Sequence, residues 1–344
     1  RDRSPSRGLG DVYKRQGYYH GNGYAVTWTN GEIIEAEYKH GEKFVMNSGQ
    51  DMRQMYAHHF NFRMRSYDAL LGWEKSKADE SQLSVIKALW AKSSVIVNAM
   101  EPTFEGELAF LNLYWYLRMP VTVRRAWLSR LRKPLILRGV ENGVYSPDKH
   151  EKWLAGELVN FFLEADAVAA ENAPDIESAE NNPTDEGCDV ELNIVKGQTL
   201  HNMVTLWMDA TMELGYDFEP TFLIAHKLYA KGLISYPYLY QNGIPGNVYH
   251  AMCRDFRVLE HNAQYGQMAK EVGWLSTRNT FHNDETSYNG HGIVTTGLHP
   301  TDLSRDEERL YNLIVRRVIE AFTPDENDIQ KKSRKKRKSC KKAG

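Results

Sequence analysis

Cysteine is scarce in this sequence, whose 344 residues contain only Cys188, Cys253 and Cys340. The three are scattered and form no Cys-x-x-Cys pair, so the sequence predicts neither a disulfide framework nor a zinc site. Sparse, unpaired cysteine is typical of a reducing compartment, and we therefore expect a cytoplasmic protein.

Long hydrophobic runs are also missing. No apolar stretch approaches the ~18–20 residues that a membrane-spanning helix needs, and the polar, Gly-rich start does not resemble a signal peptide. A phosphate-binding loop of the form Gly-x-x-x-x-Gly-Lys-Ser/Thr is absent as well. We therefore expect no membrane partner and no use of ATP.

Charge is nearly balanced overall but unevenly distributed. The formal net charge is −2, yet the segment 331–342 (KKSRKKRKSCKK) holds nine Lys and Arg and no acid, which leaves the rest of the chain at −11. Such a tail is expected to be disordered, because like charges repel and nothing apolar can be buried. It is suited to grip nucleic-acid phosphates without sequence preference; the alternative is a merely solubilising tail. The expected DNA-binding residues are Lys331, Lys332, Arg334, Lys335, Lys336, Arg337 and Lys338.

The hydrophobic content of 42% is enough for two packed domains. Alternating residues and an Asn30-Gly31 turn signal predict strands in 17–45. A short apolar strand is expected at 94–99. Helical periodicity predicts helices at 82–92, 105–117, 151–170 and 305–322, the last capped by Ser304.

One stretch organises the second half of the chain: Phe222 to Pro237, FLIAHKLYAKGLISYP. Its spacing predicts a short amphipathic helix that Thr221 caps and Gly232 ends. An extended segment then delivers Tyr236, and Pro237 fixes the backbone behind it. A tyrosine held in this way is a candidate nucleophile, although the chain contains 19 tyrosines and most tyrosines serve packing.

The sequence segments around Tyr236 make the hypothesis of a nucleophile more specific. LYAKGLISYP at 228–237 resembles the LYEKGLITYPRTDS segment of type IA DNA topoisomerases, especially the topoisomerase III branch. Further stretches match in the family's order over roughly half the chain. They are GYYHGNGYAVTW (17–28), SSVIVNAMEPTFEGELAF (93–110), RRAWLSRL (124–131), LHNMVTLWMDATMELGYDFEPTFLIAHKLY (200–229), AQYGQMAKEVGWLSTRNTF (263–281) and TGLHPTDLSRDEERLYNLIVRRVIEAF (296–322).

The resemblance implies an α/β plus mainly α protein. A partial Toprim-like α/β domain is expected at 17–140 and a mostly helical, tyrosine-bearing domain at 200–324. Residues 1–16 read as a non-native leader, because they lack periodicity and DVYKRQ resembles adapter-derived sequence. Residues 141–199 read as a divergent helix and an acidic linker, and 325–344 as the basic tail.

An acidic loop follows the predicted strand at 94–99. Strand, acidic loop and helix is the arrangement that places ligands at a strand's carboxyl end, and carboxylates are the ligands that Mg²⁺ prefers. In the family this loop reads D-x-D-x-E or D-x-G-R-E before G-E. Here Glu101, Glu105 and Glu107 remain, whereas Thr103 and Phe104 replace family residues. We expect a Mg²⁺ site that is weak or lost; the alternative is a solvated helix start, where acids are favoured anyway.

The tyrosine's surroundings depart further from the family. In the family, an arginine and a histidine assist the tyrosine in Y-x-R-T-D-S and H-H-A-I-I-P-T. Tyr238 stands at the arginine position and Gly290 at the first histidine position, while His291 remains next door. The family's N-terminal Glu-Lys pair and its G-R-V-Q-T-P motif have no counterpart here. We take Tyr236 and His291 as the catalytic candidates.

The expected protein is thus a truncated, divergent relative of type IA DNA topoisomerases. The ancestral reaction is Mg²⁺-assisted, ATP-independent cleavage and religation of single-stranded DNA through a 5′-phosphotyrosine. The alternatives are a catalytically silent protein that binds single-stranded DNA, and a truncated gene product. Tyr238, Tyr240 and Tyr288 are either base-stacking residues or ordinary packing. We expect a monomer.

Overall fold

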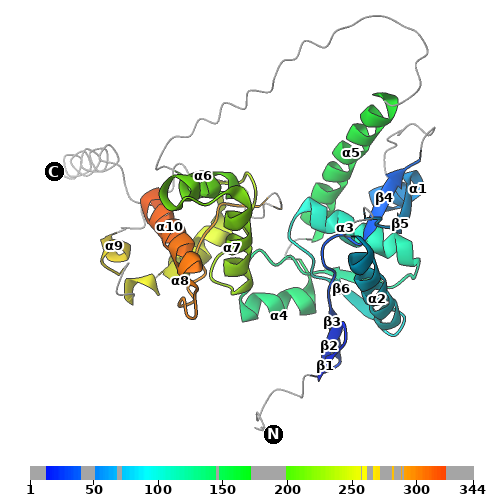
Figure 1. The fold of residues 1–344 in the computed structure, drawn as a ribbon, viewed down its shortest axis with the longest axis horizontal. Coiled ribbons are helices and arrows are strands. Elements are labelled where there is room, and N and C mark those ends of the chain that lie inside the picture. The colour runs from blue at the N-terminus through cyan, green and yellow to red at the C-terminus, as the bar shows by residue number, and fades with distance from the viewer. Residues whose placement is uncertain are drawn as a thin grey trace, which may run out of the picture. The chain divides into compact units, whose positions relative to one another are not determined.

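The computed structural model divides the chain into two compact units (Figure 1). Unit 1 comprises residues 1–127 and 140–176, and unit 2 comprises residues 128–139 and 177–344. The structure describes residues 13–39, 51–67, 72–144, 147–171, 199–256, 258–261, 266–271, 281–282, 288 and 290–322. The predicted acidic linker and the basic tail, with all seven candidate DNA-binding cations, lie outside the described residues.

Unit 1 combines short strands with helices. Its described strands are β1 (Tyr13–Arg15), β2 (Tyr18–Gly21), β3 (Tyr24–Thr27), β4 (Ile34–Tyr38), β5 (Phe60–Met64), β6 (Val95–Asn98) and β7 (Thr122–Arg125). The pairs β1-β2, β2-β3 and β4-β5 are antiparallel, and β6-β7 is parallel. Its helices are α1 (Met52–His59), α2 (Gly72–Trp90), α3 (Phe104–Leu117) and α5 (Pro147–Glu171); α4 (Lys133–Asn142) crosses the division between the units.

The first sheet corrects one turn prediction. The hairpin between β2 and β3 turns at Asn22-Gly23, where both residues have positive φ (51° and 80°). This is the backbone that a tight two-residue hairpin requires. The prediction that Asn30-Gly31 forms the hairpin turn was wrong, because the strands on either side of it, β3 and β4, belong to different sheets. β1 falls within the predicted leader and pairs with β2.

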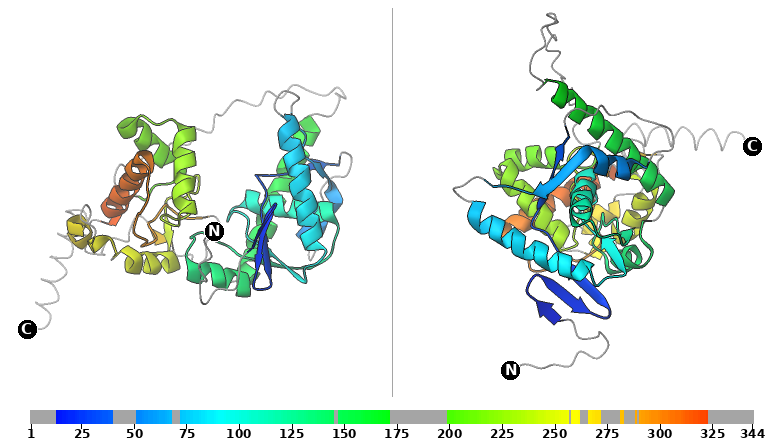
Figure 2. Two further views of the ribbon diagram at one scale, coloured as in Figure 1. Left: turned by 60° about the horizontal axis from the view of Figure 1, so that its bottom comes forward. Right: turned by 90° about the vertical axis from the view of Figure 1, so that its right-hand side faces the viewer.

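A glutamine ties this sheet to the rest of unit 1. The Gln82 side chain in α2 donates hydrogen bonds to the Gly17 carbonyl, the Thr27 hydroxyl and the Trp28 carbonyl, at 3.0, 2.9 and 2.7 Å. In Figure 2 the sheet lies beside α2 at the edge of the unit. The two hydrogens of one side-chain amide, shared among three acceptors, therefore hold a sheet whose own residues are largely exposed.

The acidic loop lies where the sequence predicts it. Strand β6 is followed by Glu101–Thr103, then by α3, and the chain returns in β7 parallel to β6. Thr103 caps α3, its hydroxyl accepting a hydrogen bond from the Gly106 amide at 3.1 Å. The apolar face of α3 packs into both hydrophobic cores of this unit, with Phe110 and Leu113 in one and Leu111 in the other.

Unit 2 is mainly helical among its described residues. Its elements are α6 (Met203–Leu214), α7 (Phe218–Ala230), β8 (Ile244–Pro245), α8 (Gly246–Phe256), the 3₁₀ turn η1 (Leu259–His261), α9 (Gly266–Glu271), β9 (Phe281–His282) and α10 (Arg305–Phe322). α10 packs against α6 and α7 (Figure 1). It ends and begins where the sequence predicts, and its predicted buried face is buried throughout: Leu310, Leu313, Ile314, Val318 and Phe322.

Helix α7 starts earlier than predicted. Asp217 occupies the N-cap position, and the proposed cap Thr221 lies inside the first turns. Its hydroxyl donates to the Asp217 carbonyl at 2.8 Å, four residues back. The prediction failed because Pro220 is well tolerated in a first turn, where its missing amide is not needed. Among the described residues of both units, no helix is long and apolar enough to cross a membrane.

Candidate functional site around Tyr236

The backbone on both sides of Tyr236 is held by hydrogen bonds. Gly232, with φ of 72°, ends the turn after α7, and Ile234 forms an antiparallel bridge with Thr295. The Ser235 amide donates to the Val294 carbonyl at 2.8 Å. The Tyr236 amide donates to the Ser129 carbonyl at 2.8 Å. A segment fixed in this way satisfies the main requirement of a positioned nucleophile.

The Tyr236 side chain lies in an aromatic surround. It is only 7% exposed. Its ring contacts Tyr238, Tyr229 and His226, with ring centres at 5.0, 5.3 and 5.5 Å and edge-to-face geometry. The Tyr229 hydroxyl donates to the Leu128 carbonyl at 2.6 Å, which anchors one wall. The candidate nucleophile is therefore packed like a core residue.

Tyr238 and Gly290 occupy one space. Gly290 has a φ of 94°, and a Cβ built on it would lie 2.3–2.7 Å from three atoms of the Tyr238 ring. Real Cβ atoms do not approach carbon this closely, so a side chain at 290 and a tyrosine ring at 238 exclude each other here. The two departures from the family pattern noted in the sequence are thus one packing unit.

His291 lies one ring further from Tyr236. It is 3% exposed, and its Nδ1 is 2.8 Å from the Gly292 carbonyl. Its ring centre lies 5.6 Å from that of Tyr238, which in turn contacts Tyr236. The structure therefore brings the two catalytic candidates into one cluster, with Tyr238 contacting both.

His226 is a residue that the sequence reasoning missed. Its Nδ1 lies 2.9 Å from the Phe222 carbonyl, which can only accept, so the neutral ring carries its proton on Nδ1. Its Nε2 is then a lone-pair acceptor, and among the described residues this buried atom has no hydrogen-bond partner. The available signal was its place on α7, one turn before Tyr229 on the face that meets the Tyr236 loop.

The acidic loop in unit 1 is held by an arginine. Arg125 donates through Nε to Glu107, and through its terminal nitrogens to the carbonyls of Met100 (2.9 Å) and Glu101 (2.7 Å). Its guanidinium also lies 4.7 Å over the Trp127 ring. Arg125 thus bonds the backbone carbonyls of the loop that follows β6.

Glu107 is a buried anion with internal partners. It is 3% exposed, and His150 Nε2 lies 3.6 Å from its carboxylate. Burial by itself raises the pKa of Glu107, but the neighbouring His150 ring and the charge of Arg125 outweigh it, so the pKa is lowered overall. Glu107 is therefore ionised at neutral pH and already neutralised by the protein.

These residues do not fit a magnesium ion as they stand. Glu101 and Glu105 are exposed, whereas Glu107 is buried against Arg125. Throughout the described ranges, no three His, Cys, Asp or Glu side chains gather as a metal site would require. Thr103, which replaces a family carboxylate, is occupied as the cap of α3.

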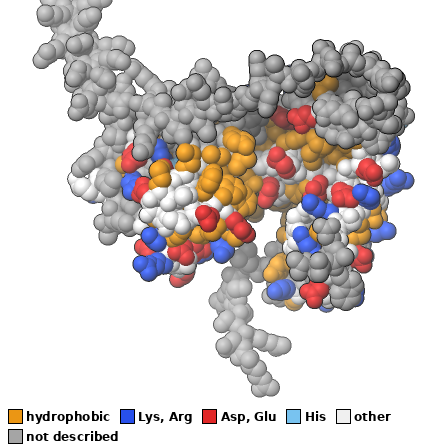
Figure 3. All heavy atoms as spheres, turned by 45° about the horizontal axis from the view of Figure 1, so that its top comes forward, with side chains coloured by type: hydrophobic (Ala, Val, Ile, Leu, Met, Phe, Trp, Pro, Cys, Tyr) orange, Lys and Arg blue, Asp and Glu red, His pale blue; other side chains and the backbone are white. Residues whose placement is uncertain are grey.

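The remaining tyrosine candidates separate by burial. Tyr238 and Tyr288 are 5% and 8% exposed, as packing residues are, whereas Tyr240 is 73% exposed. Leu137, Leu239 and Leu298 are also exposed in unit 2. Four further exposed apolar side chains lie on α6 and α7, and hydrophobic side chains gather over this part of the molecule in Figure 3. They are Met212, Phe218, Phe222 and Leu223.

Comparison with known proteins supports the resemblance in the half of the chain that carries Tyr236. The sequence model of the DNA topoisomerase family matches residues 188–342. The chain is 29% identical over 145 residues to a DNA topoisomerase 1 of Alkalihalophilus pseudofirmus, covering 39% of this chain and 19% of that protein. It is 26% identical over 184 residues to a DNA topoisomerase 1 of Methanothermobacter thermautotrophicus, covering 53% of this chain and 23% of that protein.

The chain thus matches about a fifth of the length of these curated relatives. Neither match specifies a branch of the family. The matched region contains Tyr236, Gly290, His291 and the basic tail. Residues 188–342 of this chain are therefore similar to the DNA topoisomerase family.

Proposed function

We propose that this protein is a divergent relative of type IA DNA topoisomerases, of the topoisomerase III-like branch, that binds single-stranded DNA and has little or no strand-cleaving activity. The support for DNA as partner is the family match over 188–342 and the run of nine cations in 331–342. The exposed ring of Tyr240, two residues after Tyr238, adds a surface on which a base can stack.

The observation that carries the loss of cleavage is the mutual exclusion of Tyr238 and a side chain at 290. A tyrosine hydroxyl has a pKa near 10, so attack at neutral pH needs a cation or base beside the phenolate. Where the family supplies an arginine and a histidine, this chain supplies one packed phenol ring. Each lost electrostatic contact at such a site typically costs about 10²–10³ in rate.

The test is covalent trapping on the full chain. Purified protein is mixed with end-labelled single-stranded DNA, with and without Mg²⁺, and quenched with detergent before electrophoresis. We expect no protein–DNA adduct, together with binding in anisotropy that weakens as salt is raised. An adduct that is present in the wild type and lost in Tyr236→Phe would overturn the silent-protein proposal. Absence of any DNA binding would overturn the proposal altogether.

His226 supports a second candidate function, weak cleavage through Tyr236. Its Nε2 is buried without a hydrogen-bond partner among the described residues, and the centre of its ring lies 5.5 Å from that of the Tyr236 ring. In that case Nε2 would take the phenolic proton as Tyr236 Oη attacks a phosphodiester, the bond to the 3′ oxygen breaking as the bond to Tyr236 forms. An adduct that falls about tenfold or more in His226→Gln, but not in the exposed-site control His299→Gln, would favour this candidate.

A further inference from the structure

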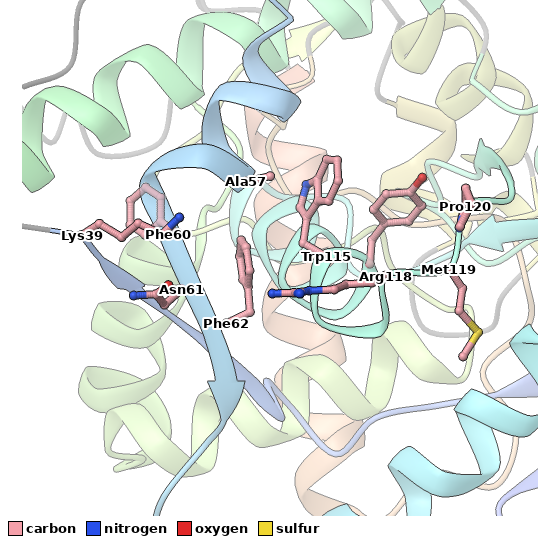
Figure 4. Close-up of a pocket in the computed structure, with 10 residues that line it drawn as sticks. Lys39, Ala57, Phe60, Asn61, Phe62, Trp115, Arg118, Met119 and Pro120 are labelled. Atoms are coloured by element: carbon pink, nitrogen blue, oxygen red, sulfur yellow. The ribbon is translucent and has the colours of Figure 1, made fainter. Parts of the chain in front are cut away.

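A cavity of about 440 Å³ opens in unit 1, away from the acidic loop (Figure 4). It lies at the carboxyl end of α3, whereas the acidic loop lies at its amino end. Fourteen residues separate the two ends, roughly 20 Å of helix. The lining residues come from the end of β4, from α1, β5 and α3, and from the turn after α3, so the cavity is independent of Tyr236 and of the acidic residues.

The walls of the cavity are aromatic and its rim is cationic. Phe60 and Phe62 from β5 face Trp115 from α3 across it, and Lys39 and Arg118 bring positive charge. Figure 4 shows the Arg118 side chain extending from the end of α3 towards Phe62. The volume of the cavity lies within the range of small-molecule sites, about 300–1,000 Å³.

Two donors at this cavity lack partners within the described part of the chain, whereas Lys39 Nζ donates to the His58 carbonyl at 2.6 Å. The Trp115 indole nitrogen is buried and makes no hydrogen bond there. The Arg118 guanidinium is exposed, and none of the hydrogen bonds or ion pairs found among the described residues involves it. A buried donor without a partner costs about 1–3 kcal/mol. The Arg118 guanidinium, by contrast, is accessible to a ligand that supplies acceptor oxygens.

The backbone conformation of Arg118 also supports a ligand site here. Arg118 follows the last turn of α3 with φ 51° and ψ 34°, the left-handed conformation. Helices usually place glycine or asparagine at such a position, because a Cβ there costs roughly 1–2 kcal/mol. Strained residues of this kind gather at functional sites. The arginine is therefore kept against a local preference for glycine.

We propose that this cavity binds one nucleotide unit, with the base between the aromatic walls and the phosphate at Arg118 and Lys39. Aromatic rings stack on every base, and an arginine matches a phosphate with two parallel hydrogen bonds. A free nucleotide and a nucleotide within a single strand share this chemistry. The second source rests on the proposed function, and the experiment separates the two.

The test uses the full chain and two probes. Thymidine monophosphate is titrated by calorimetry, and a fluorescein-labelled oligothymidylate of about 12 nucleotides is titrated by anisotropy. Arg118→Gly is the decisive variant, because glycine relieves the left-handed strain while the guanidinium is removed. We expect an unchanged or higher melting temperature with about tenfold weaker binding. Trp115→Phe keeps an aromatic wall of smaller area and should weaken binding about threefold, whereas the exposed Lys92→Gln, with the same charge change as Arg118→Gly, should not weaken it.

The outcomes are distinguishable. Weaker binding of both probes by Arg118→Gly supports a site for free nucleotides, and weaker binding of the oligonucleotide alone supports a site for a strand. If Arg118→Gly weakens the binding of neither probe relative to wild type and Lys92→Gln, the cavity proposal is overturned while DNA binding stands. If neither probe binds the wild type, both proposals fail.

Discussion

At the scale of single residues, the site around Tyr236 is decided by one shared volume. The Tyr238 ring fills the space beside Gly290, and only glycine leaves room for it while accepting a φ of 94°. A side chain at 290 beside the Tyr238 ring would therefore clash with it.

This reading predicts a strong coupling between the two positions. Gly290→Ala should lower the free energy of unfolding by at least about 2 kcal/mol, from the clash and the left-handed backbone together. Gly215→Ala is the matched control, because Gly215 has φ 72° and nothing within 4 Å of a built Cβ, so it should cost only about 1 kcal/mol. In urea unfolding, Tyr238→Ala combined with Gly290→Ala should cost clearly less than the sum of the two. Simple additivity would contradict the shared volume.

The Glu107–Arg125 pair is a second case in which a residue expected to serve the site instead serves packing. A carboxylate that the family resemblance assigns to a metal is instead neutralised by a buried guanidinium. Removing the charge from one partner leaves the other buried without compensation, which costs about 3–5 kcal/mol. The pair therefore holds the acidic loop in place through Arg125's bonds to the loop carbonyls.

We predict that Glu107→Gln destabilises unit 1 strongly and changes its response to acid. Because the pKa of Glu107 is lowered in the folded state from 4.5, its stabilising contribution is present above about pH 4.5. That contribution is lost as the pH falls through the lowered folded value. Urea unfolding at pH 7 and in the acid range should therefore show a wild-type loss that the variant lacks. Glu151→Gln, which breaks an exposed ion pair with Arg53, should change the stability by less than about 1 kcal/mol at either pH.

At the scale of elements, α10 shows how local signals set a helix. The Glu307 amide donates to the Ser304 hydroxyl at 3.2 Å, and the Ser304 amide donates to the Glu307 carboxylate at 2.7 Å. Lys231, just past α7, pairs with the same carboxylate at 2.8 Å. The cap thus links the start of α10 to the turn that leads to Tyr236.

Ser304→Ala should therefore lower the stability of unit 2 by about 1 kcal/mol, because the first turn of α10 loses an acceptor for its amides. Ser304→Gly should cost only a few tenths. Thermal unfolding followed by circular dichroism measures both. Equal stability of Ser304→Ala and wild type would mean that packing of the buried face alone sets the start of the helix.

At the scale of the whole molecule, each unit encloses its own hydrophobic core. The core of unit 2 gathers residues of α6, α7 and α10, such as Leu206, Leu228 and Leu310. The cores of unit 1 form around α2, α3 and α5, with Ile86, Leu113 and Leu158 among them. Units with separate cores are in general able to fold as separate domains.

We expect scanning calorimetry to resolve two transitions for this reason. Gly290→Ala should lower only the transition of unit 2, and Glu107→Gln only that of unit 1. A single transition that both variants shift would show that the units unfold as one cooperative body.

The sequence by itself determined the features whose cause is local. The bounds of α10 follow from a 3.6-residue apolar period and from a cap that joins two residues only three positions apart, Ser304 and Glu307. The strand–loop–helix order of β6 and α3 likewise follows from an apolar run, an acidic turn and a helical period. The family resemblance also depends on sequence alone, and the comparisons support it over residues 188–342.

Only the tertiary structure decided what the candidate site residues touch. Arg125 meets Glu107 from 18 positions away, and Tyr238 meets position 290 from a different segment. The roles proposed for His226, Trp115 and Arg118 depend on groups that lie beside them in space and not in sequence. The hairpin turn was misplaced for the same reason, since two Asn-Gly pairs have equal local preference and only strand pairing selects Asn22-Gly23. Periodicity and caps are short-range properties, whereas exclusion of one side chain by another is set by the packing of distant segments.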